Sequence, residues 1–179
     1  MSAVADARRS ARVFVGSAVA MVTAGLVALM AHQPWLFPSL GPAIMLHLEK
    51  PGAPESSPRN TFIGHAVALL AGYGMLAVCG LTAHPSVLDE GVSPVRIVAA
   101  AGSLAVTAVV LLLLIASHPP AGATTLIVSL GLLHTPEQLL VAACAVVLVT
   151  AVDWVFNRAT GQPMPVWAAR TEREGTRHG

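Results

Sequence analysis

Charged residues are scarce in this sequence. They make up 11% of its 179 residues, against 55% hydrophobic residues, and the mean hydropathy is strongly positive. Because charged residues are about a quarter of a soluble domain, this composition excludes that class and predicts an all-α integral membrane protein. The formal net charge of +1 argues against nucleic acid as a partner, since proteins that bind it carry concentrated basic surface.

Cysteines and paired metal ligands are also lacking. Cys79 and Cys144 each lie within a long apolar run, where a free thiol behaves as a small hydrophobe, so neither a disulfide framework nor a cysteine metal site is indicated. None of the seven histidines forms an HxxxH pair, and no acidic residue accompanies them at membrane depth. We therefore expect no enzyme activity, no metal and no cofactor.

Four apolar runs reach the roughly 20 residues that cross a hydrocarbon core of about 30 Å: residues 13–31, 61–82, 95–116 and 137–157. The first is longer than the core of a signal peptide, about 7 to 15 residues, and is interpreted as a retained helix. We expect one transmembrane domain, residues 1–157, followed by a short polar cytoplasmic tail, residues 158–179.

Arginines flank both ends of the apolar region: Arg8, Arg9, Arg12, Arg158, Arg170, Arg173 and Arg177. The positive-inside rule then predicts that both termini are cytoplasmic, which requires an even number of crossings. A composition rich in arginine and poor in lysine suggests a bacterial plasma membrane.

Two shorter apolar segments, 34–48 and 118–133, follow the first and third long runs. Each begins with a stretch rich in histidine and proline, passes through a glycine, and continues as a short predicted helix. A long helix with proline in its first turn comes next, where the missing N–H of proline costs nothing. The order long helix, broken segment, long helix occurs twice, which indicates an internal repeat.

The repeat allows two topologies. A partly extended and partly helical segment 34–48 reaches roughly 33 Å, enough to cross. Six passes would then form two inverted halves of three, an arrangement that places discontinuous helices at the bilayer midplane. If both segments dip in and return, there are four spans with two re-entrant segments. Six passes leave nine of the ten Lys and Arg residues in the cytoplasm and four passes leave eight, so charge favours six.

A helix that begins at membrane depth directs its unpaired N–H groups and positive dipole end towards a protein-lined cavity, which suits an anion. The interiors of the long runs hold no lysine, and Arg96 stands near the end of one run. An anion would therefore bind through backbone amides, hydroxyls and histidine. The candidate residues for its path are Ser39, Gly41, Ala43, Asn60, Thr61, His65, His118, Pro119, Pro120, Gly122, Ala123, Thr124 and Thr125.

The stretches "HPPAGATT", "SLGP" and "PRNTFIGH" resemble the HPP family of small integral membrane proteins, named for the tripeptide found here at residues 118–120. The resemblance covers about residues 10–157. It implies a transporter, usually described with four spans, and relatives in plants and cyanobacteria are implicated in moving nitrite. Some members carry an added cytoplasmic regulatory domain, which we do not expect in the short tail.

Taken together, these features predict a membrane transporter or channel for a small monovalent anion, with nitrite as the first candidate. The alternatives are a carrier of cations or other small solutes, and a scaffold or sensor subunit that transports nothing. A chain this small would not enclose a cavity unaided, so we expect a homo-oligomer of unspecified order. Importing an anion into a negative cell interior costs about 2.3 kcal/mol per 100 mV, and His65 or His118 is the candidate carrier of a compensating proton.

The face formed by Thr61, His65, Ala68 and Gly72 has two interpretations. Their spacing of four, three and four residues puts them on one side of a helix. The functional interpretation is a polar site beside a groove of small residues, because an ionisable group at membrane depth indicates function by default. The alternative is that this groove only packs against a neighbouring helix, as the stripe of Gly64, Ala68 and Gly72 would.

Other polar residues have simpler expected roles. His118 either bonds a free carbonyl at the end of the third span or takes part in permeation. Asn60 is expected first as a helix cap and second as a cavity residue. His47 is expected at the water interface, and Asp153 is expected near the headgroups or paired with Arg158.

Overall fold

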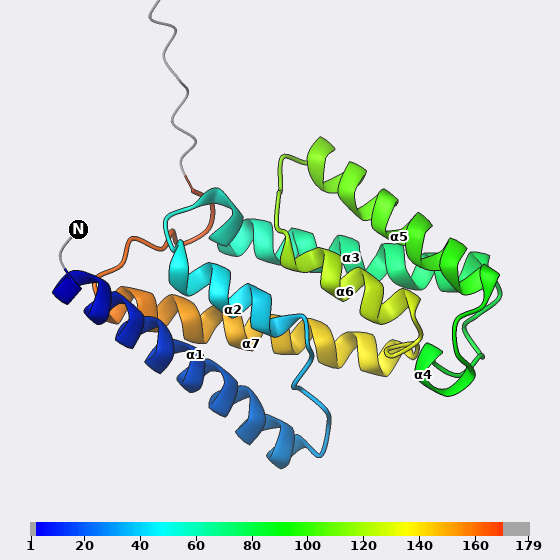
Figure 1. Ribbon diagram of the computed structural model, residues 1–179, viewed down its shortest axis with the longest axis horizontal. Helices are drawn as coiled ribbons and strands as arrows, with labels where there is room; N and C mark the ends of the chain where they lie inside the picture. The colour runs from blue at the N-terminus through cyan, green and yellow to red at the C-terminus, as the bar shows by residue number, and fades with distance from the viewer. Residues whose placement is uncertain (1–2, 170–179) are drawn as a thin grey trace, which may run out of the picture.

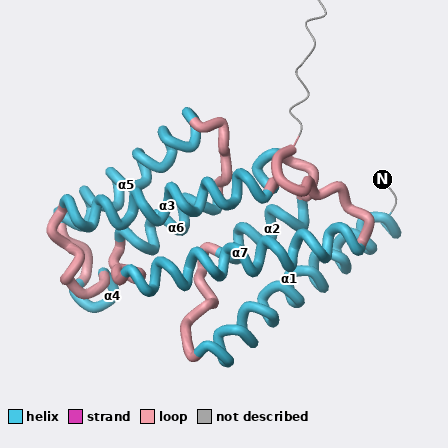
Figure 2. Tube along the Cα trace, turned by 180° about the vertical axis from the view of Figure 1, so that it is seen from behind, coloured by secondary structure: helices cyan, strands magenta, loops and turns pink. Residues whose placement is uncertain are grey.

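The structure is a computed structural model that describes residues 3–169. Over this range the chain forms seven α-helices and one 3₁₀ turn, with no strand (Figures 1 and 2). The elements are α1 (Ala3–Ala31), α2 (Leu40–Glu49), η1 (Pro54–Ser56), α3 (Pro58–Val78), α4 (Val87–Glu90), α5 (Pro94–Leu113), α6 (Pro120–Ser129) and α7 (Pro136–Ala159). The all-helical class predicted from the sequence is confirmed.

Helices α1, α3, α5 and α7 are long and apolar enough to cross a membrane, and they coincide with the four long apolar runs of the sequence. Two of them end earlier than predicted. Helix α3 stops at Val78 because Gly80 has a φ of +68° and turns the chain out of the helix. Helix α5 stops at Leu113, and Ile115 there adopts a left-handed φ of +49°.

Helices α2 and α6 are the short helices predicted in the two broken segments. Each has ten residues and is therefore about 15 Å long, half of the hydrocarbon core. They start at Leu40 and Pro120, slightly before the glycines that were predicted as their first residues. A Cβ on Gly41 would meet nothing within 4 Å, and one on Gly122 only a methyl carbon at 3.6 Å. Neither glycine is therefore required for the break, and α6 begins instead at Pro120, where the missing N–H of proline costs nothing.

The two halves of the chain interlock. Helix α2 packs against α1 and α7, whereas α6 packs against α3 and α5, so the last helix of each half lies in the other half's group. Helices α3 and α7 also contact each other. Figure 1 shows that α2 and α6 run in opposite directions, as do α3 and α7.

Small residues make close helix packing possible. On α1, Ala20 and Ala24 are fully buried, and a Cβ on Gly16 would lie 2.7 Å from Cε1 of Phe156. The matching stripe on α5 is also buried: Ala99, Ser103 and Thr107. Small residues on these faces therefore let the helices pack closely together.

Candidate functional site

Three buried histidines come together from different elements. His47 lies on α2, His65 on α3, and His118 in the loop before α6, and each is at most 2% exposed. The ring centroids of His65 and His118 are 5.0 Å apart, and those of His47 and His118 are 6.1 Å apart. We call these residues the histidine cluster.

His65 and His118 belong to one hydrogen-bonded chain. The Nδ1 atom of His118 lies 2.8 Å from the carbonyl oxygen of Glu55, its Nε2 lies 3.2 Å from Nε2 of His65, and Nδ1 of His65 lies 2.8 Å from Oγ1 of Thr124. A carbonyl only accepts, so Nδ1 of His118 donates and its Nε2 accepts when the ring is neutral. His65 then donates from Nε2 and accepts from the Thr124 hydroxyl. Every ring nitrogen in this chain has a partner with both rings neutral.

His47 belongs to a second chain that contains an acid. Its Nδ1 lies 2.8 Å from Oδ2 of Asp153 on α7, and its Nε2 lies 2.9 Å from Oγ1 of Thr61. The Thr61 hydroxyl also lies 3.1 Å from the Ser57 carbonyl oxygen. Both His47 and Asp153 are 0% exposed, and Oδ1 of Asp153 has no hydrogen-bond partner. A titratable pair is therefore buried beside the first chain.

Two sequence predictions are wrong at this point. His47 does not lie at the water interface, because it shares the inward face of α2 with the buried Leu40 and Ile44. Asp153 neither reaches the headgroups nor pairs with Arg158, whose guanidinium lies over the Trp154 ring at 5.5 Å from its centroid. The spacing of Leu40, Ile44 and His47 was a usable signal, since it places all three on one helical face.

The "PRN" stretch at the start of α3 holds the loop that carries His118. Arg59 donates to the carbonyl oxygens of Leu114 and Ile115, at 3.2 and 3.1 Å, and Asn60 donates from Nδ2 to the Ser117 carbonyl oxygen at 3.2 Å. The predicted role of Asn60 as a helix cap is wrong, because Ser57 is the N-cap and accepts from the Asn60 N–H. These bonds fix the chain just before His118.

The carbonyl that His118 bonds is not one at the end of the third span. Its partner is Glu55 of η1, while Arg59 occupies the last carbonyls of α5. His118 thus ties the α6 start to the turn before α3. A Cβ on Gly64 would lie 2.8 Å from Cβ of His118, and one on Gly72 would lie 2.7 Å from Cβ of Val128. The α3 stripe packs against α6, as the alternative interpretation expected, and it also carries His65 of the cluster.

The remaining predicted path residues lie in three places. Thr124 joins the histidine cluster, whereas Thr125 turns to α5 and bonds Oγ1 of Thr107 at 2.9 Å. Ser39, Gly41 and Ala43 lie at the start of α2, and Ser39 stands eight residues before His47, about 12 Å along a helix. The structure therefore does not bring the α2 start and the histidine cluster together.

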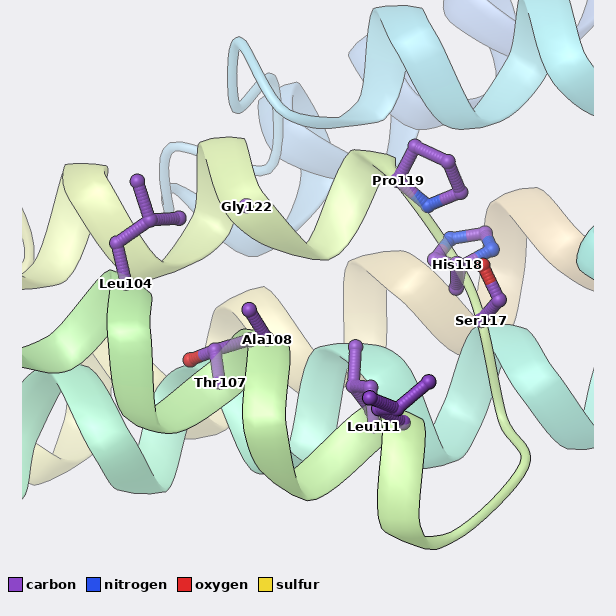
Figure 3. Close-up of a pocket in the computed structure, with 9 residues that line it drawn as sticks. Leu104, Thr107, Ala108, Leu111, Ser117, His118, Pro119 and Gly122 are labelled. Carbon is purple, nitrogen blue, oxygen red and sulfur yellow. The ribbon is translucent and has the colours of Figure 1, made fainter.

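A cavity of about 330 Å³ opens between α5 and the start of α6 (Figure 3). Its polar lining comes from Thr107, Ser117 and His118, and its other walls are apolar. In Figure 3, Ser117 and His118 lie together at one end and Leu104 at the other. Pro119 and Gly122 also line this cavity, whereas Pro120 and Ala123 line a second groove of about 520 Å³ between α2 and α6.

The short helices are held at their C-terminal ends by arginines that the sequence did not assign to this role. Arg12 on α1 donates from Nη2 to the Leu48 carbonyl oxygen of α2 at 2.6 Å. Arg96 on α5, which is 2% exposed, bonds the Ser129 carbonyl oxygen of α6 at 3.5 Å and that of Pro85 at 2.8 Å. A cation at a helix C-terminus satisfies free carbonyls and opposes the negative end of the helix dipole.

The histidine cluster does not have the arrangement of a metal site. Within residues 3–169, no three His, Cys, Asp or Glu side chains are placed to hold one metal ion. All six ring nitrogens of His47, His65 and His118 instead have hydrogen-bond partners. The cluster is a hydrogen-bonding network.

A family model for the HPP transmembrane region matches residues 2–165 of this chain. The match covers all the helices described above and the "HPP" stretch at residues 118–120, so the chain belongs to the HPP transmembrane family and is an integral membrane protein. No curated protein and no solved structure matches the chain.

Proposed function

We propose that this protein transports a small monovalent anion, with nitrite as the first candidate, along a path at the start of α6. The supporting observation is the placement of His118. The Pro119–Pro120 break leaves its buried ring at the N-terminal end of a half-length helix, next to a cavity of about 330 Å³. The positive dipole end of α6 and the Ser117 hydroxyl face the same region, which favours a negatively charged solute. The predicted unpaired amides are not found at Ala121 and Gly122, whose N–H groups bond the carbonyl oxygens of His118 and Pro119.

The cavity's composition favours passage over tight retention. No lysine or arginine lines the cavity, so an anion there would be held by the α6 dipole and by the Ser117 hydroxyl. Weak binding of this kind lets an ion leave as readily as it enters. The proposal assigns no chemical reaction and no cofactor to the protein.

The proposed topology is six passes with inverted halves and both termini in the cytoplasm. It is supported by the opposite directions of α2 and α6 in Figure 1 and by the equivalent arginines, Arg12 and Arg96, at their C-terminal ends. Arg96 would be extracellular, but it is buried and bonded to carbonyls. Arg96 therefore counts little against the six-pass topology, because the positive-inside rule concerns charges in loops.

A second candidate function is cation transport, and Asp153 is the observation that favours it. A cation carrier would need a buried acid, and Asp153 is 0% exposed with an unpartnered Oδ1. Carboxylates inside membrane proteins commonly mark ion or proton pathways. We place this candidate second because Asp153 does not line the cavity beside α6.

Flux into liposomes that contain the purified protein tests both candidates. Nitrite entry is measured against empty liposomes, which correct for passage of nitrous acid through lipid, and sodium entry is measured in parallel. The proposal predicts nitrite entry well above empty liposomes and no added sodium entry. Sodium entry alone would support the cation candidate, and no entry of either ion by folded protein would favour a scaffold. Native mass spectrometry of the same sample would test the expected homo-oligomer.

A further inference from the structure

The His47–Asp153 pair has a feature that the proposed anion path does not use. Asp153 accepts one hydrogen bond at Oδ2, from His47, and none at Oδ1, although it is fully buried. A buried carboxylate with so few donors is costly as an isolated negative charge. A proton added to the pair removes that net charge.

The Thr61 hydroxyl lets the His47 ring keep both of its hydrogen bonds in either protonation state. With His47 neutral, its Nδ1–H donates to Asp153 and the Thr61 hydroxyl donates to Nε2. With His47 protonated, Nε2–H donates to Thr61 at 2.9 Å, and the hydroxyl turns to the Ser57 carbonyl oxygen at 3.1 Å. Both states satisfy the ring nitrogens. Rotation of one hydroxyl therefore accommodates the added proton.

Charged and titratable groups reach this pair from every element that packs around it. From α1, Arg12 bonds Oδ1 of Asn157 at 2.9 Å, and Asn157 on α7 donates to the His47 carbonyl oxygen at 3.1 Å. His65 lies on α3 one turn from Thr61, and the His118 ring before α6 lies 6.1 Å from that of His47.

The His65–His118 chain lacks an equivalent counter-charge. Its outer partners are the Thr124 hydroxyl and the Glu55 carbonyl, both uncharged. A proton added there would create a buried cation with no acid in the chain, whereas a proton added to His47 forms a neutral ion pair. Of the two chains, the one that contains Asp153 is therefore better suited to hold an added proton.

We infer that the His47–Asp153 pair binds a proton that crosses the membrane together with the anion, one proton per anion. This inference rests on the proposed anion transport. The proton adds to Nε2 of His47 from water on one side and leaves to water on the other, and no bond to the anion forms or breaks. Protonated His47 lies beside His118, so an anion at the α6 start strengthens proton binding, and the proton strengthens anion binding equally.

The test is nitrite entry into proteoliposomes under a pH gradient or under a potassium diffusion potential set with valinomycin. One proton per anion makes the wild-type cycle electroneutral. A gradient of one pH unit, acidic outside, then gives about tenfold nitrite accumulation, and the potential has no effect. In His47→Gln and Asp153→Asn, nitrite alone crosses. After the entry into empty liposomes, which includes nitrous acid, is subtracted, the initial nitrite entry of these variants ignores the pH gradient and instead follows an inside-positive potential, whose limiting accumulation is about tenfold per 59 mV.

Matched variants separate this role from folding. Thr150→Val removes a buried hydroxyl from α7 that bonds only the Val146 carbonyl, one turn from Asp153, and it keeps the wild-type response. Thr61→Val slows the pH-driven entry, while Thr61→Ser restores it. Pair variants that fold and still respond to pH but not to voltage would overturn the inference and leave anion transport standing. Wild-type entry driven by voltage would also overturn it, whereas no wild-type nitrite entry would refute the proposed function itself.

Discussion

Gly64→Ala is expected to disturb the histidine cluster through one added methyl group. The new Cβ would lie 2.8 Å from Cβ of His118 and 3.2 Å from its Cγ and Cδ2. His118 cannot easily move away, because it bonds Glu55 on one side and His65 on the other and precedes a proline. Overpacking of this kind costs about 1–3 kcal/mol.

Gly74→Ala on the same helix is the matched control, since its Cβ would meet nothing within 4 Å. Both substitutions gain similar helix propensity, about 1 kcal/mol. Their difference in the free energy of unfolding therefore isolates the steric term, and we expect Gly64→Ala to be less stable by about 1–3 kcal/mol. The assay is reversible unfolding in detergent micelles, followed by circular dichroism. Equal stability of the two variants would refute the close approach of α3 to His118.

Three further predictions concern the chain's arginines and topology. Arg96→Met leaves the carbonyls of Ser129 and Pro85 without their donor and should lower the free energy of unfolding by about 1–3 kcal/mol in the same assay; unchanged stability would contradict the capping role. Arg59→Gln frees the α5 end beside His118 and should reduce nitrite entry several-fold with little loss of helix content; full entry would show that this anchor is dispensable. Six passes place Lys50 in the cytoplasm and His84 outside. In a background without native cysteines, an impermeant maleimide added to intact cells should therefore label His84→Cys but not Lys50→Cys. The reverse pattern would indicate four passes.

The membrane helices and their breaks were predictable because they depend on local sequence. Hydropathy identifies the four long spans, and proline at the first helical position predicts that helices begin at Pro58 and Pro136, as they do. The starts of α2 and α6 were misassigned by one or two residues because glycine was taken as the break. At Gly41 and Gly122 the surroundings leave room for a side chain.

The acid in the site was not predictable from local pattern. His47 and Asp153 are 106 residues apart and meet only because α7, the last helix of the second half, packs against α2 of the first half. The position of an aspartate near the end of a span predicts that it lies at the membrane interface, and only the tertiary packing shows that Asp153 is buried. The buried, carbonyl-bound position of Arg96 was not predictable for the same reason, since its partners lie on α6 and in the loop before α4.

The most direct test of the central claim is the initial rate of nitrite entry into proteoliposomes for Gly122→Leu compared with Gly74→Leu. Gly122 lines the cavity beside His118, whereas Gly74 is on the exposed side of α3 with no neighbour within 4 Å of its Cβ position. A path at the α6 start predicts that Gly122→Leu lowers the rate to that of empty liposomes while Gly74→Leu matches the wild type. Equal rates in folded Gly122→Leu and wild-type protein would contradict an anion path at this position.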